Sequence, residues 1–184
     1  MTLLEQLRRY APVCEQEERD RAKMLSFLEH GETPFSRANE TAHFTASAWI
    51  VDRTRTKVLF VYHKIYDSWS WVGGHADGEA DLAAVALREA NEETGITSGR
   101  LVTGDILSLE IITVEAHIRK GKYVAPHLHL NLTYLVEADE NEPLTLNEDE
   151  TKGVRWFTFD EALKASNEPK MKDRIYKKLI EKAV

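Results

Sequence analysis

The pattern of apolar and polar residues predicts a strand-rich centre between two helical ends. Apolar and β-branched residues form short, dense runs in the centre, which is typical of strands that are largely buried. The predicted strands are residues 42–52 (AHFTASAWIVD), 57–64 (KVLFVYHK), 106–118 (ILSLEIITVEAHI), 127–139 (HLHLNLTYLVEAD) and 153–159 (GVRWFTF). A helix over residues 81–95 (DLAAVALREANEETG) separates the second of these strands from the third. This order predicts an α/β (α+β) fold with a mixed sheet.

The N-terminal segment is predicted to form two helices. Thr2 and Glu5 have the spacing of a capping box ahead of the first helix. The second helix is expected to begin near Pro12, which a first turn tolerates, and to end at His30-Gly31, where glycine can adopt a left-handed cap. Its apolar residues lie mainly near its C-terminal end, so only its C-terminal half is expected to be well buried.

The chain is therefore divided into three regions. Residues 1–40 are predicted to be an N-terminal helical extension, of which 31–40 (GETPFSRANE) is a loop or linker. Residues 41–165 form the main domain, and 166–184 provide a C-terminal helix that packs on the same domain. The N-terminal helices could support a homodimer.

Composition and charge narrow the class of protein. The 184 residues suit one domain with a proper core, and the net charge of −7 argues against a partner that is a nucleic acid polymer. No apolar run is long enough to span a membrane, and the N-terminus is too charged for a secretory signal. The single cysteine, Cys14, excludes an internal disulfide and suits a reducing compartment. We expect a cytoplasmic protein with no membrane partner.

The helix over residues 81–95 ends in a crowd of carboxylates, REANEE. Glu89, Glu92 and Glu93 are three and four residues apart and share a helical face, where each like-charge pair costs about 0.2–0.5 kcal/mol. Arg88 can pair with Glu92 at i+4, which leaves two carboxylates uncompensated. A divalent cation with a preference for oxygen ligands would remove the conflict. A solvated, glutamate-rich helix face is the competing interpretation.

The flanking residues favour the cation. Gly73-Gly74 follows the aromatic segment DSWSWV and lets the backbone approach a ligand closely. Thr94-Gly95 ends the helix directly after the glutamates, so they stand at its C-terminal, negative end. That end is unfavourable for carboxylates alone and favourable for a cation.

The run from Gly74 to Ile96 resembles the Nudix box, G-x5-E-x7-R-E-U-x-E-E-x-G-U, where U is a bulky apolar residue. The first glycine falls on Gly74, and the residues from the arginine onward match in spacing. Three positions depart from the pattern. Ala80 replaces the first glutamate, with Glu79 one position early, and a small Ala90 occupies the apolar slot. Val72 stands where a proline often precedes the glycines.

The flanks extend the resemblance over roughly residues 41–165. It implies a Nudix-type fold, in which a mixed sheet is sandwiched between helices. It also implies a pyrophosphohydrolase that cleaves the diphosphate linkage of a nucleoside diphosphate joined to another group. The cofactor would be Mg²⁺ or Mn²⁺, and the partner would be a nucleotide-type small molecule.

The resemblance also assigns roles by position. Glu89, Glu92 and Glu93 would hold the metal ion, with the backbone carbonyl of Gly74 as a further ligand. Arg88 would orient a carboxylate rather than contact the substrate. Glu89 is also a candidate general base, since metal-bound water needs only a nearby proton acceptor.

Other candidate residues lie outside the box. Glu150, in the acidic segment NEDET, occupies a place from which several family members supply an extra carboxylate, although a solvated turn would look the same. His127 and His129 point to one face of a strand and are assigned to a substrate or phosphate pocket, as is His75 next to the glycines. Partly buried histidines without a site role remain the alternative. No third zinc ligand is evident near His127 and His129, and the isolated His43, His63 and His117 are given no site role.

Two other functions compete with hydrolysis. The first is a catalytically silent Nudix-fold module that binds or senses a nucleotide, which a degraded REANEE segment would have favoured. The second is an isomerase of isoprenoid diphosphates with this fold, which uses a catalytic cysteine within the domain. The intact REANEE segment argues against the first, and the position of Cys14 in the N-terminal extension argues against the second.

Overall fold

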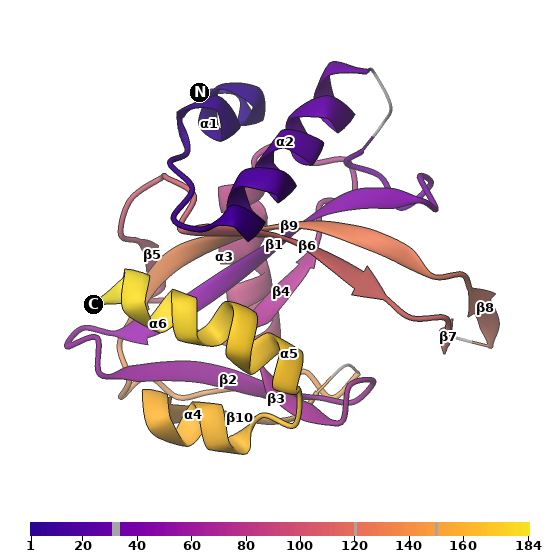
Figure 1. Ribbon diagram of the computed structural model, residues 1–184. Coiled ribbons are helices and arrows are strands. Elements are labelled where there is room, and N and C mark those ends of the chain that lie inside the picture. Colours follow the sequence, from indigo (N-terminus) through magenta and orange to yellow (C-terminus); the bar gives the residue numbers. More distant parts are fainter. Residues whose placement is uncertain (31–33, 120, 150) are drawn as a thin grey trace.

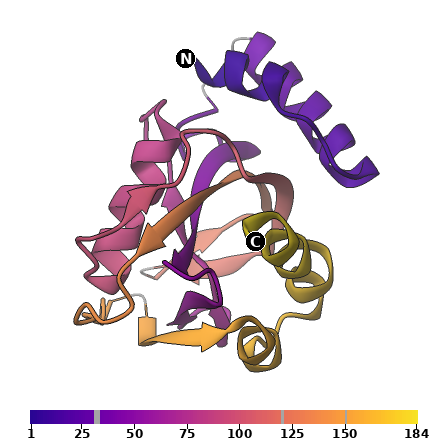
Figure 2. The ribbon, with the colours of Figure 1, turned by 90° about the vertical axis from the view of Figure 1, so that its left-hand side faces the viewer.

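The computed structural model describes residues 1–30, 34–119, 121–149 and 151–184, and these form a central sheet with helices on both faces (Figures 1 and 2). The strand order of the sheet is β10-β2-β1-β9-β5. The long strands are β1 (Ala42–Asp52), β2 (Lys57–His63), β9 (His127–Ala138) and β10 (Thr151–Thr158). β1 and β9 run parallel, whereas β1 with β2 and β2 with β10 are antiparallel, so the predicted mixed sheet is confirmed.

Short strands complete the sheet around β1 and β9. β4 pairs with β1, β3 pairs with β2, and β5 and β6 pair with β9. Their bounds are β3 (Ser68–Ser70), β4 (Val72–His75), β5 (Arg100–Leu101) and β6 (Ser108–Val114). β5 was not predicted from the sequence.

The single strand predicted over residues 106–118 is wrong. β6 ends at Val114, and β7 (His117–Arg119) pairs with β8 (Lys122–Val124) in a separate two-stranded sheet. The reason lies in the register, because Val114 pairs with His127, the first residue of β9. Between Val114 and His127, none of the described residues pairs with the main sheet, and β7 and β8 form the hairpin at the right of Figure 1.

The two faces of β1 pack against different helices. Ala42, Phe44, Ala46, Ala48 and Ile50 share a core with α3 (Leu82–Thr94). Trp49 and Val51 point the other way and share a second core with the C-terminal helix. This helix consists of α5 (Pro169–Met171), a π-helical turn (Lys172–Tyr176) and α6 (Lys177–Ala183), and it is preceded by α4 (Phe159–Ala165). Figure 2 shows the sheet between α3 and the C-terminal helix.

The N-terminal extension forms two helices, α1 (Leu3–Arg9) and α2 (Glu15–Glu29). The predicted capping box of Thr2 and Glu5 is present. The predicted start of α2 near Pro12 is three residues too early, because Cys14 is the N-cap and the Val13 N–H donates to Glu17 at 2.9 Å. The helix was predicted to end at His30-Gly31. His30 is its C-cap, and Gly31 lies outside the described residues. No helix within the described ranges is both long and apolar enough to cross a membrane.

α2 covers the outer edge of β6. The Gln16 side-chain amide donates to the Leu109 carbonyl at 3.1 Å, and the Ile111 N–H donates to Asp20 at 2.9 Å. These side chains take the place of a further strand, so the edge of β6 is not open to pairing with another chain. The extension is therefore part of the packing of the sheet.

A buried ion-pair network joins α2 to the C-terminal helix. Glu17, which is fully buried, lies 3.0 Å from Lys178 and 2.7 Å from Lys182, and Lys178 lies 2.9 Å from Glu110 on β6. Burial by itself raises the pKa of Glu17, but hydrogen bonds, first that from Lys182, lower it to about 2. For Glu110 burial prevails and raises the pKa, although Lys178 opposes the shift. The expectation that only the C-terminal half of α2 is well buried is thus wrong.

Candidate active site

α3 presents the carboxylates, and its two ends form as predicted. Asp81 caps the N-terminus by accepting the Ala84 N–H at 3.1 Å. Gly95 ends the helix in the left-handed conformation, with φ 75°, directly after the glutamates. The carboxylates therefore lie within the last two turns of the helix, at the negative end of its dipole.

The three glutamates differ in exposure. Glu93 is only 4% exposed, whereas the side chains of Glu89 and Glu92 are 16% and 57% exposed. Arg88 lies 3.9 Å from Glu92, which confirms the predicted ion pair, and it also lies 3.3 Å from Glu89. The carboxylate of Glu93 is thus buried, and the more exposed carboxylates of Glu89 and Glu92 lie beside the Arg88 guanidinium group.

Gly74 lies directly against Glu89. A Cβ atom at position 74 would sit 2.3 Å from Cδ of Glu89 and 2.4 and 2.6 Å from its carboxylate oxygens. Only glycine leaves room for the carboxylate to lie over β4. This contact brings the start and the end of the Gly74–Ile96 segment together, which sequence spacing alone did not show.

The loop between β4 and α3 is held by the segment that precedes β1. The guanidinium group of Arg37 donates two hydrogen bonds, one to each carboxylate oxygen of Asp77. The Gly78 N–H donates to the Phe35 carbonyl at 2.8 Å. Glu79 accepts the Asp81 N–H at 2.9 Å, beside the helix cap. The loop is therefore braced although Ala80 replaces the glutamate of the Nudix box. The sequence carried no signal for the role of Arg37.

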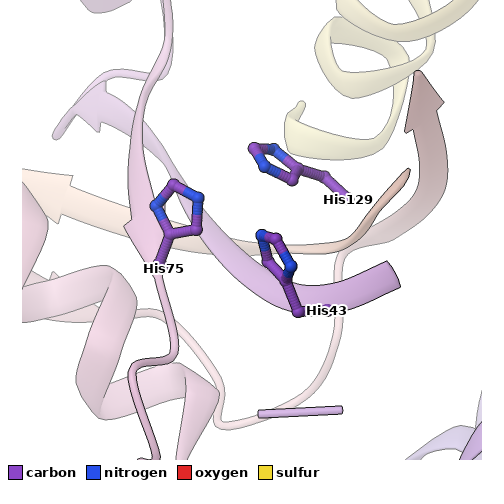
Figure 3. A group of neighbouring side chains, drawn as sticks. All are labelled: His43, His75 and His129. Atoms are coloured by element: carbon purple, nitrogen blue, oxygen red, sulfur yellow. The ribbon is translucent and has the colours of Figure 1, made fainter. Parts of the chain in front are cut away.

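Four histidines gather on the other face of the sheet. Gly74 and His75 point to opposite faces of β4, so His75 points away from Glu89. The His75 ring lies 5.2 Å from that of His43 on β1 and 4.8 Å from that of His129 on β9, centroid to centroid. His127 lies beside His129, with 3.2 Å between their Nε2 atoms. Figure 3 shows His43, His75 and His129 converging from three strands.

Nothing in the sequence indicated that His43 and His75 lie close to His129, and no third nitrogen donor was evident near His127 and His129. His43, His75 and His129 each offer a nitrogen, and these atoms lie within 4.8 Å of one another. The parallel pairing of β1 with β9 puts His43 opposite His129. The antiparallel pairing of β4 with β1 puts His75 opposite Thr45, two residues along β1 from His43. Such pairings join residues that are far apart in the sequence.

The surroundings of the histidines favour neutral imidazoles. Burial, and after it the nearby charges of His75, His43 and His127 when protonated, together lower the pKa of His129 to about 2. Burial also lowers the pKa of His43. Neutral imidazoles can act as metal ligands or hydrogen-bond acceptors at pH 7.

The structure thus brings Gly74, Arg88, Glu89, Glu92 and Glu93 together and groups His75, His127 and His129 on the opposite face. The catalytic, metal-binding and substrate-binding roles of these residues stay predictions. Glu150 lies outside the described residues, so its predicted role is not tested.

Comparisons with known proteins agree with this arrangement. The NUDIX domain family model matches residues 41–180. The fold is similar to an Ap4A hydrolase from C. elegans in a binary complex, with a TM-score of 0.52, 21% identity, and coverage of 76% of this chain and 93% of that chain. It is also similar to a NUDIX-family hydrolase from Clostridium perfringens, with a TM-score of 0.52, 21% identity, and coverage of 74% and 95%.

A search of curated proteins found no match for the sequence. The family match covers well over half of the chain and includes the whole of β1, β4 and α3. The chain therefore belongs to the NUDIX family.

Proposed function

We propose that the protein hydrolyses a diphosphate linkage in a nucleoside diphosphate joined to another group, with Mg²⁺ or Mn²⁺ bound at the C-terminal end of α3. The observation that carries this proposal is the contact between Glu89 and Gly74. It places a carboxylate against the backbone of β4, one helical turn before Glu92 and Glu93. The site then has carboxylates on the helix and a backbone carbonyl on the strand.

The donor atoms fit a hard divalent cation. Mg²⁺ and Mn²⁺ prefer oxygen ligands, and Mg²⁺ is usually held by a few carboxylates together with water and substrate phosphates. Glu89, Glu92 and Glu93 supply carboxylate oxygens, and Gly74 supplies a backbone carbonyl. The exposure of Glu92 leaves one side of the site open to water and to the substrate. Like-charge repulsion on the helix would fall once a cation is bound.

The residues have distinct parts in the reaction. A bound divalent cation offsets phosphate charge and lowers the pKa of a water molecule. Glu89 accepts a proton from the water as the water oxygen attacks phosphorus, and the bond from phosphorus to the bridging oxygen breaks. Arg88, 3.3 Å from Glu89, holds that carboxylate in place. Glu92 and Glu93 serve as ligands.

The substrate class rests on the family and on the chemistry of the site. Because one of the similar structures is an Ap4A hydrolase, dinucleoside polyphosphates are the first substrates to test. ADP-ribose, modified nucleoside triphosphates and coenzyme A derivatives complete the panel. All of these carry a phosphoanhydride, so they share the bond that the site would cleave.

The test is a turnover assay of the full chain on this panel with Mg²⁺, with Mn²⁺ and with excess chelator. Glu92→Gln and Glu93→Gln should lower turnover by at least about 10²-fold, the lower range for loss of a catalytic group. Glu18→Gln is the control, because Glu18 is exposed and lies on α2, outside the proposed site. Circular dichroism checks that each variant is folded. Full activity in chelator, or in both α3 variants, would overturn the proposal.

A further inference from the structure

The histidine cluster is built from three strands on the face of the sheet opposite the α3 carboxylates. His43 is on β1, His75 on β4 and His129 on β9, and one nitrogen of each lies within 4.8 Å of the other two (Figure 3). His127 adds a fourth imidazole beside His129. The strand pairings fix the backbone positions of these residues, so the cluster does not depend on a loop conformation.

Hydrogen bonds orient two of the rings. Nδ1 of His43 lies 2.9 Å from the Asn39 carbonyl, and Nδ1 of His127 lies 2.8 Å from the Ala125 carbonyl. A carbonyl only accepts, so each Nδ1 carries the hydrogen and each Nε2 presents a lone pair. Metal-bound histidines commonly have this arrangement, in which the second ring nitrogen donates to a backbone carbonyl.

The lone pair of His43 is buried without a partner. Its Nε2 atom has no hydrogen bond to any group in the described parts of the chain, although the residue is only 3% exposed. Burying a polar atom in this state is unfavourable unless something satisfies it. The atom belongs to a ring that faces those of His75, His127 and His129.

We propose that His43, His75 and His129 bind one Zn²⁺ ion, or a divalent transition-metal ion of similar preference, through their ring nitrogens. Imidazole suits Zn²⁺, whereas Mg²⁺ prefers oxygen, so this ion is chemically distinct from the one proposed at α3. Tetrahedral ligands about 2.0–2.1 Å from zinc lie roughly 3.3 Å apart. The nitrogens would therefore move inward by small side-chain rotations when the ion binds.

His127 lies within reach of the fourth position. Its Nε2 atom is already 3.2 Å from that of His129, close to the spacing between two ligands of one tetrahedral ion. A bound ion would join the start of β1 to β4 and β9, next to the loop that leads into α3. The proposal is independent of the proposed hydrolysis, because it rests on nitrogen donors on the other face of the sheet.

The test is calorimetric titration of the chelator-treated full chain with Zn²⁺ in excess Mg²⁺, together with the visible absorption spectrum of the Co²⁺-loaded protein. We expect one Zn²⁺ per chain, unaffected by Mg²⁺, and a tetrahedral Co²⁺ spectrum. His43→Gln, His75→Gln and His129→Gln should each weaken binding by at least about tenfold, the lower bound found even for residues that only support a ligand. His30→Gln, a histidine at the exposed end of α2, is the matched control.

Two results would overturn the proposal. One is the absence of stoichiometric Zn²⁺ binding by the unaltered chain, which no folding defect of a variant can explain. The other is Zn²⁺ binding that survives all three histidine variants but is lost in Glu92→Gln, which would place the ion at the α3 carboxylates. His75→Gln and His129→Gln depend less on core packing than His43→Gln, because His75 and His129 are partly exposed whereas His43 is buried.

Discussion

The two faces of β1 differ in where polar and charged side chains lie. On the α3 face its inward residues are alanines, Phe44 and Ile50, and the carboxylates stand at the end of the helix that covers this core. On the other face β1 presents His43, Thr45 and Ser47, all buried, before it reaches Trp49. On the α3 face the carboxylates lie at the end of the helix, beside an apolar core. On the other face polar side chains of β1 are buried against the sheet.

This difference separates two kinds of cation site. The α3 carboxylates range from buried to exposed and supply oxygen, which suits an ion that keeps water and meets a phosphate substrate. The histidines supply nitrogen from adjacent strands and suit an ion held mainly by the protein. Gly74 and His75, neighbours in the sequence, belong to two different proposed sites on opposite faces of the sheet.

The largest effect is expected from Glu150, which the sequence predicts to add a carboxylate to the α3 site. If Glu150 contributes a carboxylate there, Glu150→Gln should lower turnover by about 10²–10⁴-fold, the range typical of a general acid–base group. If the segment is a solvated loop, as the sequence predicts, the free energy of unfolding should change by no more than about 0.5 kcal/mol. Steady-state kinetics and urea unfolding measure the two quantities.

Glu148→Gln is the control for this variant, because Glu148 is exposed and two residues away. Equal, small losses of turnover in both variants would show that the segment is a solvated turn. A large loss of turnover in Glu148→Gln alone would show that Glu148, and not Glu150, supplies the carboxylate.

The next largest effect concerns the buried charge on the histidine face. Glu17→Gln removes the carboxylate that lies near Lys178 and Lys182, and should lower the free energy of unfolding by about 3–5 kcal/mol, as when one partner of a buried ion pair is lost. Glu18→Gln, on the exposed side of α2, should change it by no more than about 0.5 kcal/mol. Urea unfolding at pH 7 compares them, and equal results would contradict the structural role of Glu17.

The pH dependence of this effect has a defined sign. The folded protein lowers the pKa of Glu17 from 4.5 to about 2, so the carboxylate contributes fully above pH 4.5. That contribution is lost as the pH falls towards 2. The difference in stability between the unaltered chain and Glu17→Gln should therefore narrow over this range, and a constant difference would argue against the shifted pKa.

A smaller effect is expected from a single methyl group at the α3 site. Gly74→Ala would push the new Cβ into Glu89 and displace its carboxylate, which should lower turnover by about 10²-fold, as misplacement of a reacting group by 1 Å can. Gly104→Ala is the control, because no atom lies within 4 Å of a Cβ at position 104. Equal turnover of the two variants in the same assay would show that Glu89 need not lie against Gly74.

The sequence predicted the features that are encoded locally. The helix from Asp81 to Gly95 has its cap residues at both ends, so its bounds and its carboxylates could be located by spacing. The same holds for the capping box of Thr2 and Glu5, and for β1, which was predicted over residues 42–52 and forms over Ala42–Asp52.

Features that depend on contacts between distant segments could not be predicted in this way. The histidine cluster needs the parallel pairing of β1 with β9, and the burial of Glu17 needs two lysines from the last helix. The end of β6 at Val114 is set by where β9 begins. In each case the partner residue is more than a dozen positions away along the chain, and no local pattern identifies it.

The central claim is that the α3 carboxylates, and not the histidines, hold the hard cation used for hydrolysis. Titration with Mn²⁺, followed by electron paramagnetic resonance of the free ion, tests this claim directly in three proteins. The unaltered chain and His75→Gln should bind Mn²⁺ equally well, whereas Glu89→Gln/Glu93→Gln should bind it at least about tenfold more weakly. Unchanged Mn²⁺ binding in the double glutamate variant, or its loss in His75→Gln alone, would contradict the assignment.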